Sequence, residues 1–137
     1  MTKNSHLCNI IQNNPNTWRQ IIEQKRIKIK EDGVLAIFNY DIKADFRDPV
    51  VQESRGIIIN TDTATVVCWP FNKFGNYSEN YAAEIDWNTA RVLEKVDGSI
   101  VKLWFNELTG EWQWSTNACI DITHMKVVDS NYDKSAQ

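Results

Sequence analysis

The chain has 137 residues, of which 42% are hydrophobic and 24% are charged. This composition excludes a disordered chain and predicts one soluble domain, or a large part of one, with enough apolar residues to bury a core. The formal net charge of -3 argues against broad coating of nucleic acid, because such binding needs a surplus of Lys and Arg, although it leaves room for a local basic groove.

Cysteine and histidine usage disfavours a metal site. The three cysteines are widely spaced, with no Cys-x-x-Cys pair, and there are two histidines: Cys8, Cys68, Cys119, His6 and His124. A closed zinc site needs four convergent ligands, so we expect no metal ligands, no catalytic histidine, and reduced thiols in a cytoplasmic protein. The chain has neither an apolar run near the ~18 residues of a membrane span nor a charged start followed by a hydrophobic stretch, which disfavours membrane spanning and secretion.

The first predicted element is an amphipathic helix over residues 15–25. Asn14 is a typical N-cap residue, and Pro15 suits the first helical position. The residues expected on one face of this helix are Trp18, Ile21, Ile22 and Lys25.

Beyond this helix the hydrophobic period changes to two, which indicates strands. Residues 27–30 alternate between isoleucine and lysine, Asp32-Gly33 is a turn signal, and residues 34–40 form the returning strand of a hairpin. Lys28 and Lys30 are expected on a solvated strand face, although contact with RNA phosphates is an alternative. After a polar loop over 41–49, two further strands are expected at 50–60 and 65–70, joined by a turn at 61–63.

The second half begins with a long connection over 71–83, rich in Asn and aromatic residues. Strands are then expected over 90–95, 99–106 and 111–116, with a turn at 108–110 and with Trp112 and Trp114 on one face. Strands in hairpin order with little helix favour an α+β fold, mainly antiparallel sheet with an N-terminal helix. We expect one domain portion over residues 1–128 and a frayed polar tail over 129–137.

The stretch Lys95-Val96-Asp97-Gly98-Ser99 is the most informative motif. A lysine amine can attack the α-phosphate of a nucleoside triphosphate and hold the nucleotide as a phosphoramide. On an extended chain Lys95 and Asp97 point to the same side, Val96 points to the core, and Gly98 permits a sharp end to the strand. Lys-x-Asp-Gly is the pattern in which covalent nucleotidyltransferases carry this lysine.

Such a lysine needs help from its surroundings. A lysine with an ordinary pKa near 10.4 is uncharged in only about one molecule in a few thousand at pH 7, a deficit of roughly 4 to 5 kcal/mol. Desolvation, neighbouring cations or a metal ion must make up this deficit. Arg55 and Lys73 are placed upstream to do so, and either can also contact phosphate.

Three segments together carry a more specific resemblance. They are Glu-x-Arg-Gly around Arg55, Pro-x-x-Lys-Phe-x-Asn around Lys73, and Glu-Lys-x-Asp-Gly-Ser around Lys95. Their order and spacing resemble the ATP-dependent RNA ligases of the phage RNA ligase 1 kind, in the covalent nucleotidyltransferase superfamily. The resemblance runs from about Tyr40 to Ile120.

Membership of that family implies a ligase/capping-enzyme nucleotidyltransferase fold and a three-step reaction with ATP and Mg²⁺ as cofactors. The lysine would be adenylylated with release of pyrophosphate, AMP would pass to a 5′-phosphate RNA end, and a 3′-hydroxyl would then seal the strand. The family implies that Lys95 is the nucleophile, and that the nucleotide is contacted or its pocket shaped by Arg55, Lys73, Glu53, Asp97 and Gly98.

The chain departs from the patterns of related enzymes at two places. Ile100 stands where DNA ligases generally have an arginine, which favours the RNA-joining branch. The family's Ser-basic-Gly-Ser stretch is here Ser115-Thr116-Asn117-Ala118, in which the basic residue is lost and Asn117 is able to adopt the left-handed backbone of the glycine.

The family's later motifs, an acidic metal ligand and a Lys-x-Lys pair, are missing. No glutamate follows Glu111, and Lys126 and Lys134 are not such a pair. The chain therefore resembles the front section of a ligase domain, whose C-terminal part would be a further partner. Because departure of pyrophosphate requires charge neutralisation, we expect the chain alone to self-adenylylate weakly or not at all.

Other readings remain open. Functional alternatives are a DNA ligase, an mRNA capping nucleotidyltransferase, or a non-catalytic nucleotide-binding or RNA-binding module. Lys95 and Asp97 also fit an ordinary exposed ion pair, Arg55 a structural salt bridge with Glu53, and Lys73 a solvated loop lysine. The six tryptophans favour core packing over a base-stacking platform.

Overall fold

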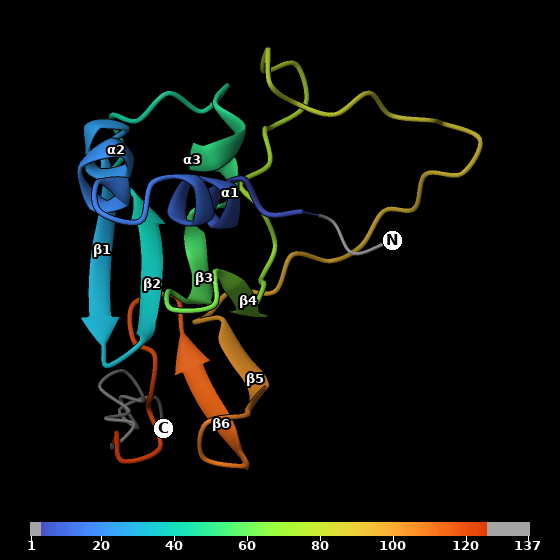
Figure 1. Cartoon of the computed structure of the whole chain (residues 1–137). Helices are drawn as coiled ribbons and strands as arrows, with labels where there is room; N and C mark the ends of the chain where they lie inside the picture. The colour runs from blue at the N-terminus through green and yellow to red at the C-terminus, as the bar shows by residue number, and fades with distance from the viewer. Residues whose placement is uncertain (1–3, 126–137) are drawn as a thin grey trace, which may run out of the picture.

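A computed structural model of the chain describes residues 4–125 and confirms the α+β class with an antiparallel sheet and an N-terminal helix (Figure 1). Strands β1 to β4 form one antiparallel sheet in that order, and β5 pairs with β6 in a separate antiparallel hairpin. The elements are α1 (His6–Asn13), α2 (Trp18–Gln24), β1 (Ile27–Asp32), β2 (Leu35–Tyr40), α3 (Pro49–Glu53), β3 (Arg55–Asn60), β4 (Thr65–Cys68), β5 (Val101–Asn106) and β6 (Glu111–Thr116).

The four-stranded sheet is covered on both faces, which explains the unbroken apolar run in β3. Ile57 and Ile59 belong to the main core, where helices α1, α2 and α3 pack on one face of the sheet. Ile58 points the opposite way and packs with Trp104 of β5 and Ile120. A strand buried on both sides needs no polar alternation, and each isoleucine fully buried there contributes roughly 1.5–3 kcal/mol.

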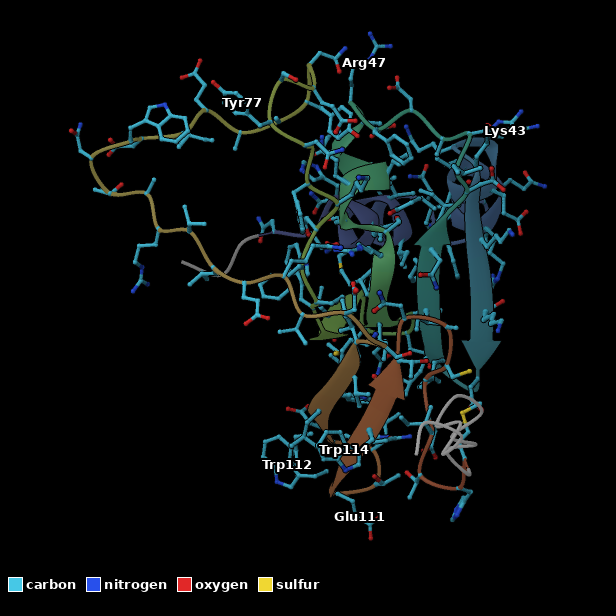
Figure 2. All side chains as sticks on the ribbon, turned by 180° about the vertical axis from the view of Figure 1, so that it is seen from behind. Lys43, Arg47, Tyr77, Glu111, Trp112 and Trp114 are labelled. Atoms are coloured by element: carbon cyan, nitrogen blue, oxygen red, sulfur yellow. The ribbon has the colours of Figure 1, made fainter. Side chains whose placement is uncertain are left out.

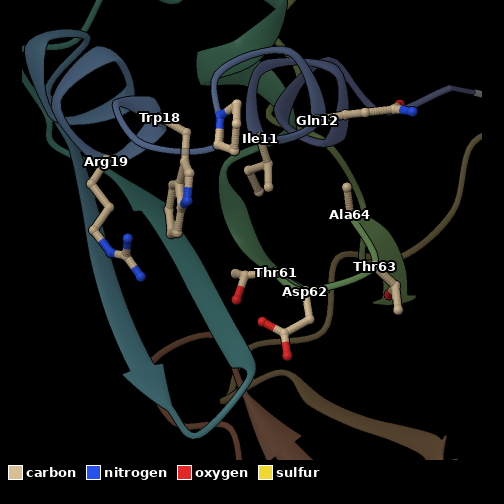
Figure 3. Close-up of a pocket in the computed structure, with 9 residues that line it drawn as sticks. Ile11, Gln12, Trp18, Arg19, Thr61, Asp62, Thr63 and Ala64 are labelled. Carbon is tan, nitrogen blue, oxygen red and sulfur yellow. The ribbon is translucent and has the colours of Figure 1, made fainter.

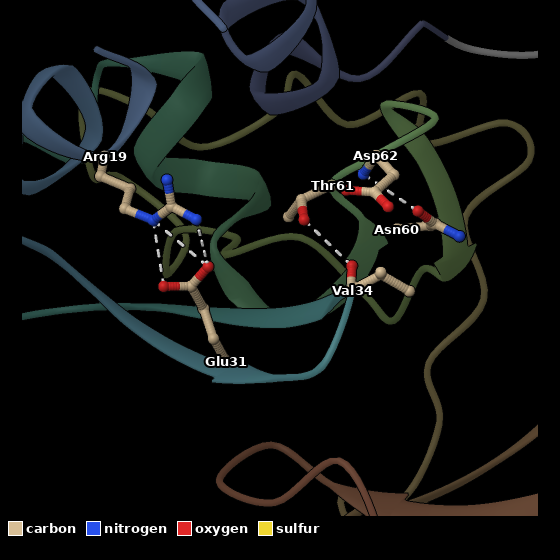
Figure 4. A network of polar contacts seen from close by, with 6 residues as sticks. All are labelled: Arg19, Glu31, Val34, Asn60, Thr61 and Asp62. Carbon is tan, nitrogen blue, oxygen red and sulfur yellow. Dashed lines mark hydrogen bonds and ion pairs between the residues drawn. The ribbon is translucent and has the colours of Figure 1, made fainter. Parts of the chain in front are cut away.

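Polar contacts tie the sheet to its neighbours (Figure 4). The Arg19 guanidinium of α2 pairs with both carboxylate oxygens of Glu31 on β1, with a shortest N–O distance of 2.6 Å. Thr61 donates to the carbonyl of Val34 through its backbone N–H at 2.8 Å and its hydroxyl at 3.0 Å. The ion pair is exposed and contributes little, whereas the paired backbone groups fix the β3–β4 turn against the start of β2.

The N-terminal helical region differs from the prediction. Helix α1 was not predicted, although Ser5 caps it by accepting from the Cys8 N–H at 3.2 Å. Asn14 is the C-cap of α1 rather than the N-cap of the next helix, because its backbone N–H and side chain both donate to the Ile10 carbonyl. Pro15 consequently falls in a turn, and α2 begins at Trp18.

The strand predicted over 50–60 is wrong in its first half. Residues Pro49–Glu53 form α3, because the Asp48 carboxylate accepts from the Val50 N–H at 2.9 Å and Pro49 takes the first helical turn. The hairpin of β1 and β2, the turn over 61–63 and strand β6 are confirmed.

The strand predicted over 90–95 is also wrong. Residues 69–100 contain no helix or strand, and this segment, coloured yellow to orange, loops away from the rest of the molecule (Figure 1). Strand hydrogen bonds require a neighbouring strand, and the described chain supplies none beside this segment. Val96, predicted to point to the core, is 81% exposed. The predicted tail over 129–137 lies outside the described residues.

Candidate functional site

Glu53, expected to shape a nucleotide pocket, lies buried beneath the start of α1. Its Oε1 accepts hydrogen bonds from the Ser5 hydroxyl at 3.0 Å and the Leu7 N–H at 2.5 Å. Burial raises the pKa of Glu53, and these two hydrogen bonds oppose that rise. The carboxylate therefore joins α3 to the first turn of α1, and it forms no ion pair with Arg55, which also lies in the described part of the chain.

Arg55 and Lys73 each lie next to aromatic rings. The Arg55 Cζ lies 5.5 Å from the centre of the Phe74 ring, next to Lys73 in the chain. The Lys73 Nζ lies 5.5 Å and 5.6 Å from the ring centres of Phe46 and Tyr81. The backbone N–H of Lys73 donates to the carbonyl of α3 residue Gln52 at 2.7 Å, which holds the loop beside Arg55. Two cations next to aromatic faces suit a ligand that combines phosphate with a base.

Gly56 brings the β5–β6 hairpin against the start of β3. Its φ of +82° is left-handed, and a Cβ there would lie 2.7–2.8 Å from the Oδ1 and Cα of Asn117. Asn117 does not adopt the left-handed backbone that was open to it, whereas Gly56 does, and only a residue without Cβ fits against Asn117 there. The Lys102 amine of β5 donates to the Gly56 carbonyl, and Asn39 donates to the Asn117 carbonyl at 2.6 Å.

Lys102 was not singled out from the sequence. It is buried on the side of β5 that faces the sheet, and burial lowers the pKa of its amine. The alternation of side chains along β5 could have indicated that Lys102 is buried, because it places Lys102 on the same side of the strand as Trp104. Lys102 connects the hairpin to the residue that follows Arg55.

The end of the lysine motif lies close to the same junction. Residues 98–100 and 116–118 line a hollow of about 390 Å³. Gly98 has a φ of +137°, as expected for a glycine that ends an extended stretch sharply. The structure therefore brings Gly98 to the 115–118 stretch, whose Asn117 packs on Gly56, next to Arg55 in sequence.

Lys95 itself is outside this arrangement. Its side chain is 92% exposed, and the partner described for its Nζ is the Asp97 carboxylate at 3.9 Å. The two side chains share a side of the chain, as predicted, and their geometry matches an ordinary exposed ion pair. Arg55 contacts Phe74, next to Lys73, and Gly98 lies near Asn117, which packs on Gly56, whereas Lys95 and Asp97 lie in solvent.

Within residues 4–125, no group of three or more His, Cys, Asp or Glu side chains could hold a metal ion. The three cysteines are all described, and each is a free thiol. No helix in this part of the chain is long and apolar enough to cross a membrane.

A larger hollow, of about 510 Å³, lies away from all of these residues. Figure 3 shows it between the helices, which contribute Ile11 and Trp18, and the β3–β4 turn, which contributes Asp62. None of the residues predicted to bind nucleotide lines it. Its size alone does not make it the site, because neither Arg55 nor Lys73 faces it.

Some tryptophans are packed in the core and others are exposed, so core packing does not account for all of them. Trp18 and Trp104 are core residues, as favoured, whereas Trp87, Trp112 and Trp114 are largely exposed. Lys28 and Lys30 are exposed on β1, and the Lys30 amine donates to the Ala118 carbonyl at 3.1 Å.

Comparison with known proteins gives two viral relatives. The chain is 31% identical over 131 residues to a protein of Autographa californica nuclear polyhedrosis virus that is named as a bifunctional polynucleotide kinase/RNA ligase, over 80% of this chain and 19% of that protein. It is 27% identical over 97 residues to the uncharacterised protein ORF64 of Ostreid herpesvirus 1, over 65% of this chain and 24% of that protein. No family model and no solved structure matches the chain. The chain is therefore related to an RNA ligase-like viral protein, of whose length it spans about a fifth.

Proposed function

We propose that the chain carries the lysine and part of the nucleotide site of an ATP-dependent RNA ligase of the phage RNA ligase 1 kind. The observation that supports this most is that Arg55 and Lys73 each lie beside aromatic rings, in segments that resemble ligase motifs. The relationship to a protein named as a polynucleotide kinase/RNA ligase points the same way. The proposed fold is that of the covalent nucleotidyltransferases, and the proposed compartment is the cytoplasm.

In the proposed reaction the Lys95 amine attacks the α-phosphorus of ATP. A P–N bond forms, the bond between the α-phosphorus and the bridging oxygen breaks, pyrophosphate leaves, and the amine proton passes to water. The AMP then moves to the 5′-phosphate of an RNA end, and a 3′-hydroxyl displaces it to seal the strand. Arg55 and Lys73 would hold the triphosphate through charge-assisted hydrogen bonds.

The exposed position of Lys95 determines the expected rate. Because the Lys95 side chain is 92% exposed and its described partner is Asp97, the stretch around Lys95 has to reorient for its amine to reach a phosphate held by Arg55 and Lys73. The proposed magnesium ion would bind mainly through the phosphates, with few ligands from the described residues. We therefore expect weak self-adenylylation from this chain alone, and faster reaction when the C-terminal part of a ligase domain supplies further cations.

The choice of nucleotide and acceptor tests this proposal. The chain would be incubated with magnesium and either ATP or GTP labelled on the α-phosphate, and then chased with RNA that carries a 5′-phosphate. We expect weak label from ATP that the RNA removes. Label from GTP alone would indicate a capping enzyme, and label that only a nicked DNA removes would indicate a DNA ligase.

The exposure of Lys95 and its pairing with Asp97 favour a second candidate function, a non-catalytic nucleotide-binding module. Such a module would bind ATP at Arg55 and Lys73 without forming a covalent bond. Calorimetry would show ATP binding with unchanged affinity in Lys95→Ala, and no adduct would form after long incubation with magnesium.

A further inference from the structure

On the β5–β6 hairpin, most apolar side chains face solvent, and several polar ones face the protein. Lys102 and Asn106 are buried on the inner side with Trp104. Val101, Leu103 and Phe105 alternate with them and point outward. This is the reverse of the usual pattern for a strand with one solvated face, which places its apolar side toward the core.

The partner strand extends this outer side with two tryptophans. In the register of the hairpin, Leu103 lies opposite Trp114 and Phe105 lies opposite Trp112. The rings of Phe105 and Trp112 are 5.6 Å apart in an edge-to-face arrangement. Figure 2 shows Trp112 and Trp114 projecting from β6 near Glu111, at the end of the molecule away from Arg47 and Tyr77. We call Val101, Leu103, Phe105, Trp112 and Trp114 the outer hairpin face; these residues are 45–67% exposed.

We propose that the outer hairpin face is the contact surface of a symmetric dimer of this chain. In a two-fold contact the same residues meet themselves, so any charge on the surface would lie near its own copy. None of the five residues is charged, and Thr116, which lies opposite Val101, is neutral as well. The face can therefore pair with a second copy without repulsion, even though each chain carries a net charge of -3.

The size of the face is sufficient for this contact. Three aromatic side chains of about 150–250 Å² each, roughly half exposed, together with Val101 and Leu103, present on the order of 500 Å² of apolar surface. A monomer rarely leaves more than a patch of about 300–600 Å² uncovered. Two copies stacked face to face would bury on the order of 1,000 Å², the lower limit of a specific interface. Sheets that stack face to face lie about 10 Å apart.

The same residues fit RNA poorly, although exposed aromatics can stack on bases. Binding of single strands combines stacking with cations that follow the phosphates, and the outer hairpin face has no cation. Lys102, the lysine of β5, is buried on the opposite side of the strand, and the exposed side chains at the hairpin tip include Glu107 and Glu111. An apolar protein surface is the partner that this chemistry favours.

Sedimentation velocity on the full chain, from low micromolar to several hundred micromolar concentration, tests the proposal without nucleotide and so independently of the proposed ligase function. We expect a reversible monomer–dimer equilibrium. Trp114→Lys places a charge at the centre of the contact and should raise the dissociation constant at least about tenfold. Leu108→Lys, an exposed change in the turn of the same hairpin but outside the face, should leave it unchanged.

Circular dichroism would establish that each variant is folded, and Leu103→Lys replaces Trp114→Lys if the latter is not. Acrylamide quenching of tryptophan fluorescence should fall as the wild-type concentration rises and stay constant in the lysine variant. A monomer at every concentration would overturn the proposal and leave the face to a different polypeptide. A dimer that persists in the folded lysine variant of the face would overturn the proposal as well, because the contact would then lie elsewhere.

Discussion

Replacing Glu53 tests the role that the structure assigns to this buried carboxylate. Glu53→Ala removes the acceptor of the Ser5 hydroxyl and the Leu7 N–H at the first turn of α1. Each buried donor left without a partner costs about 1–3 kcal/mol. Ser5 also caps α1 through the Cys8 N–H, so disorder of its side chain would weaken that bond too. We therefore expect Glu53→Ala to lower the free energy of unfolding by about 2–4 kcal/mol.

Glu53→Gln is the matched control, because its amide oxygen can accept the same two hydrogen bonds without a buried charge. Burial raises the pKa of Glu53, so the folded state binds the carboxyl proton more tightly than the unfolded state does. The contribution of protonated Glu53 is complete at low pH and decreases as the pH rises through the ordinary carboxyl range, near about 4.3, toward the raised folded pKa. Relative to Glu53→Gln, the wild type should therefore lose stability as the pH rises.

Urea denaturation, followed by tryptophan fluorescence at several pH values, measures both effects. We expect Glu53→Ala to be the least stable variant at every pH, and the gap between Glu53→Gln and wild type to widen with pH in favour of the glutamine. Equal stability of the alanine and glutamine variants would show that the hydrogen bonds to α1 contribute nothing. If the free energy of unfolding of the wild type instead increases relative to that of Glu53→Gln as the pH rises, the pKa of Glu53 is not raised on folding.

Three further substitutions test the junction and the role of Arg55. Gly56→Ala should lower the free energy of unfolding by at least about 2 kcal/mol in urea titrations, since it combines a left-handed φ with a clash against the backbone of Asn117. Burial lowers the pKa of the Lys102 amine, so the wild type should gain stability relative to Lys102→Met as the pH rises toward about 10.4, as thermal melts at pH 7 to 10 would show. Arg55→Ala should weaken ATP binding about tenfold in calorimetry, whereas Arg47→Ala, an exposed arginine in a local ion pair, should not; equal losses would contradict a specific role for Arg55.

Strand alternation and turn chemistry account for the parts of the fold that were predicted correctly. The alternation over 27–30 and the turn at Gly33, whose φ is +58°, specify the β1–β2 hairpin locally. Helix α3 was missed because its valines are typical of strands, and the capping by Asp48 outweighs that preference. Helix α1 was missed because Asn14-Pro15 resembles a helix start, whereas the first helix is capped by Ser5 and ends at Asn14.

The candidate site was predictable where it depends on short loops and not where it depends on a partner strand. The backbone of Lys73 is bonded to the carbonyl of Gln52 near the end of α3, shortly before Arg55 in sequence. The segment over 90–95 has a strand-like sequence, but sheet formation is non-local and requires a neighbour that residues 4–125 do not supply. The position of Lys95 follows from that missing pairing, which no local pattern reports.

The identity of the modified residue after treatment with ATP tests the proposed function most directly. The chain, with Lys95→Ala and the exposed-strand control Lys28→Ala, would be incubated at length with ATP and magnesium, digested, and mapped by mass spectrometry for AMP bound to lysine. We expect a small fraction of AMP on Lys95 in the wild type and in Lys28→Ala, and none in Lys95→Ala. An adduct that persists in Lys95→Ala, or no adduct on Lys95 in the wild type, would contradict the assignment of this lysine as the nucleophile.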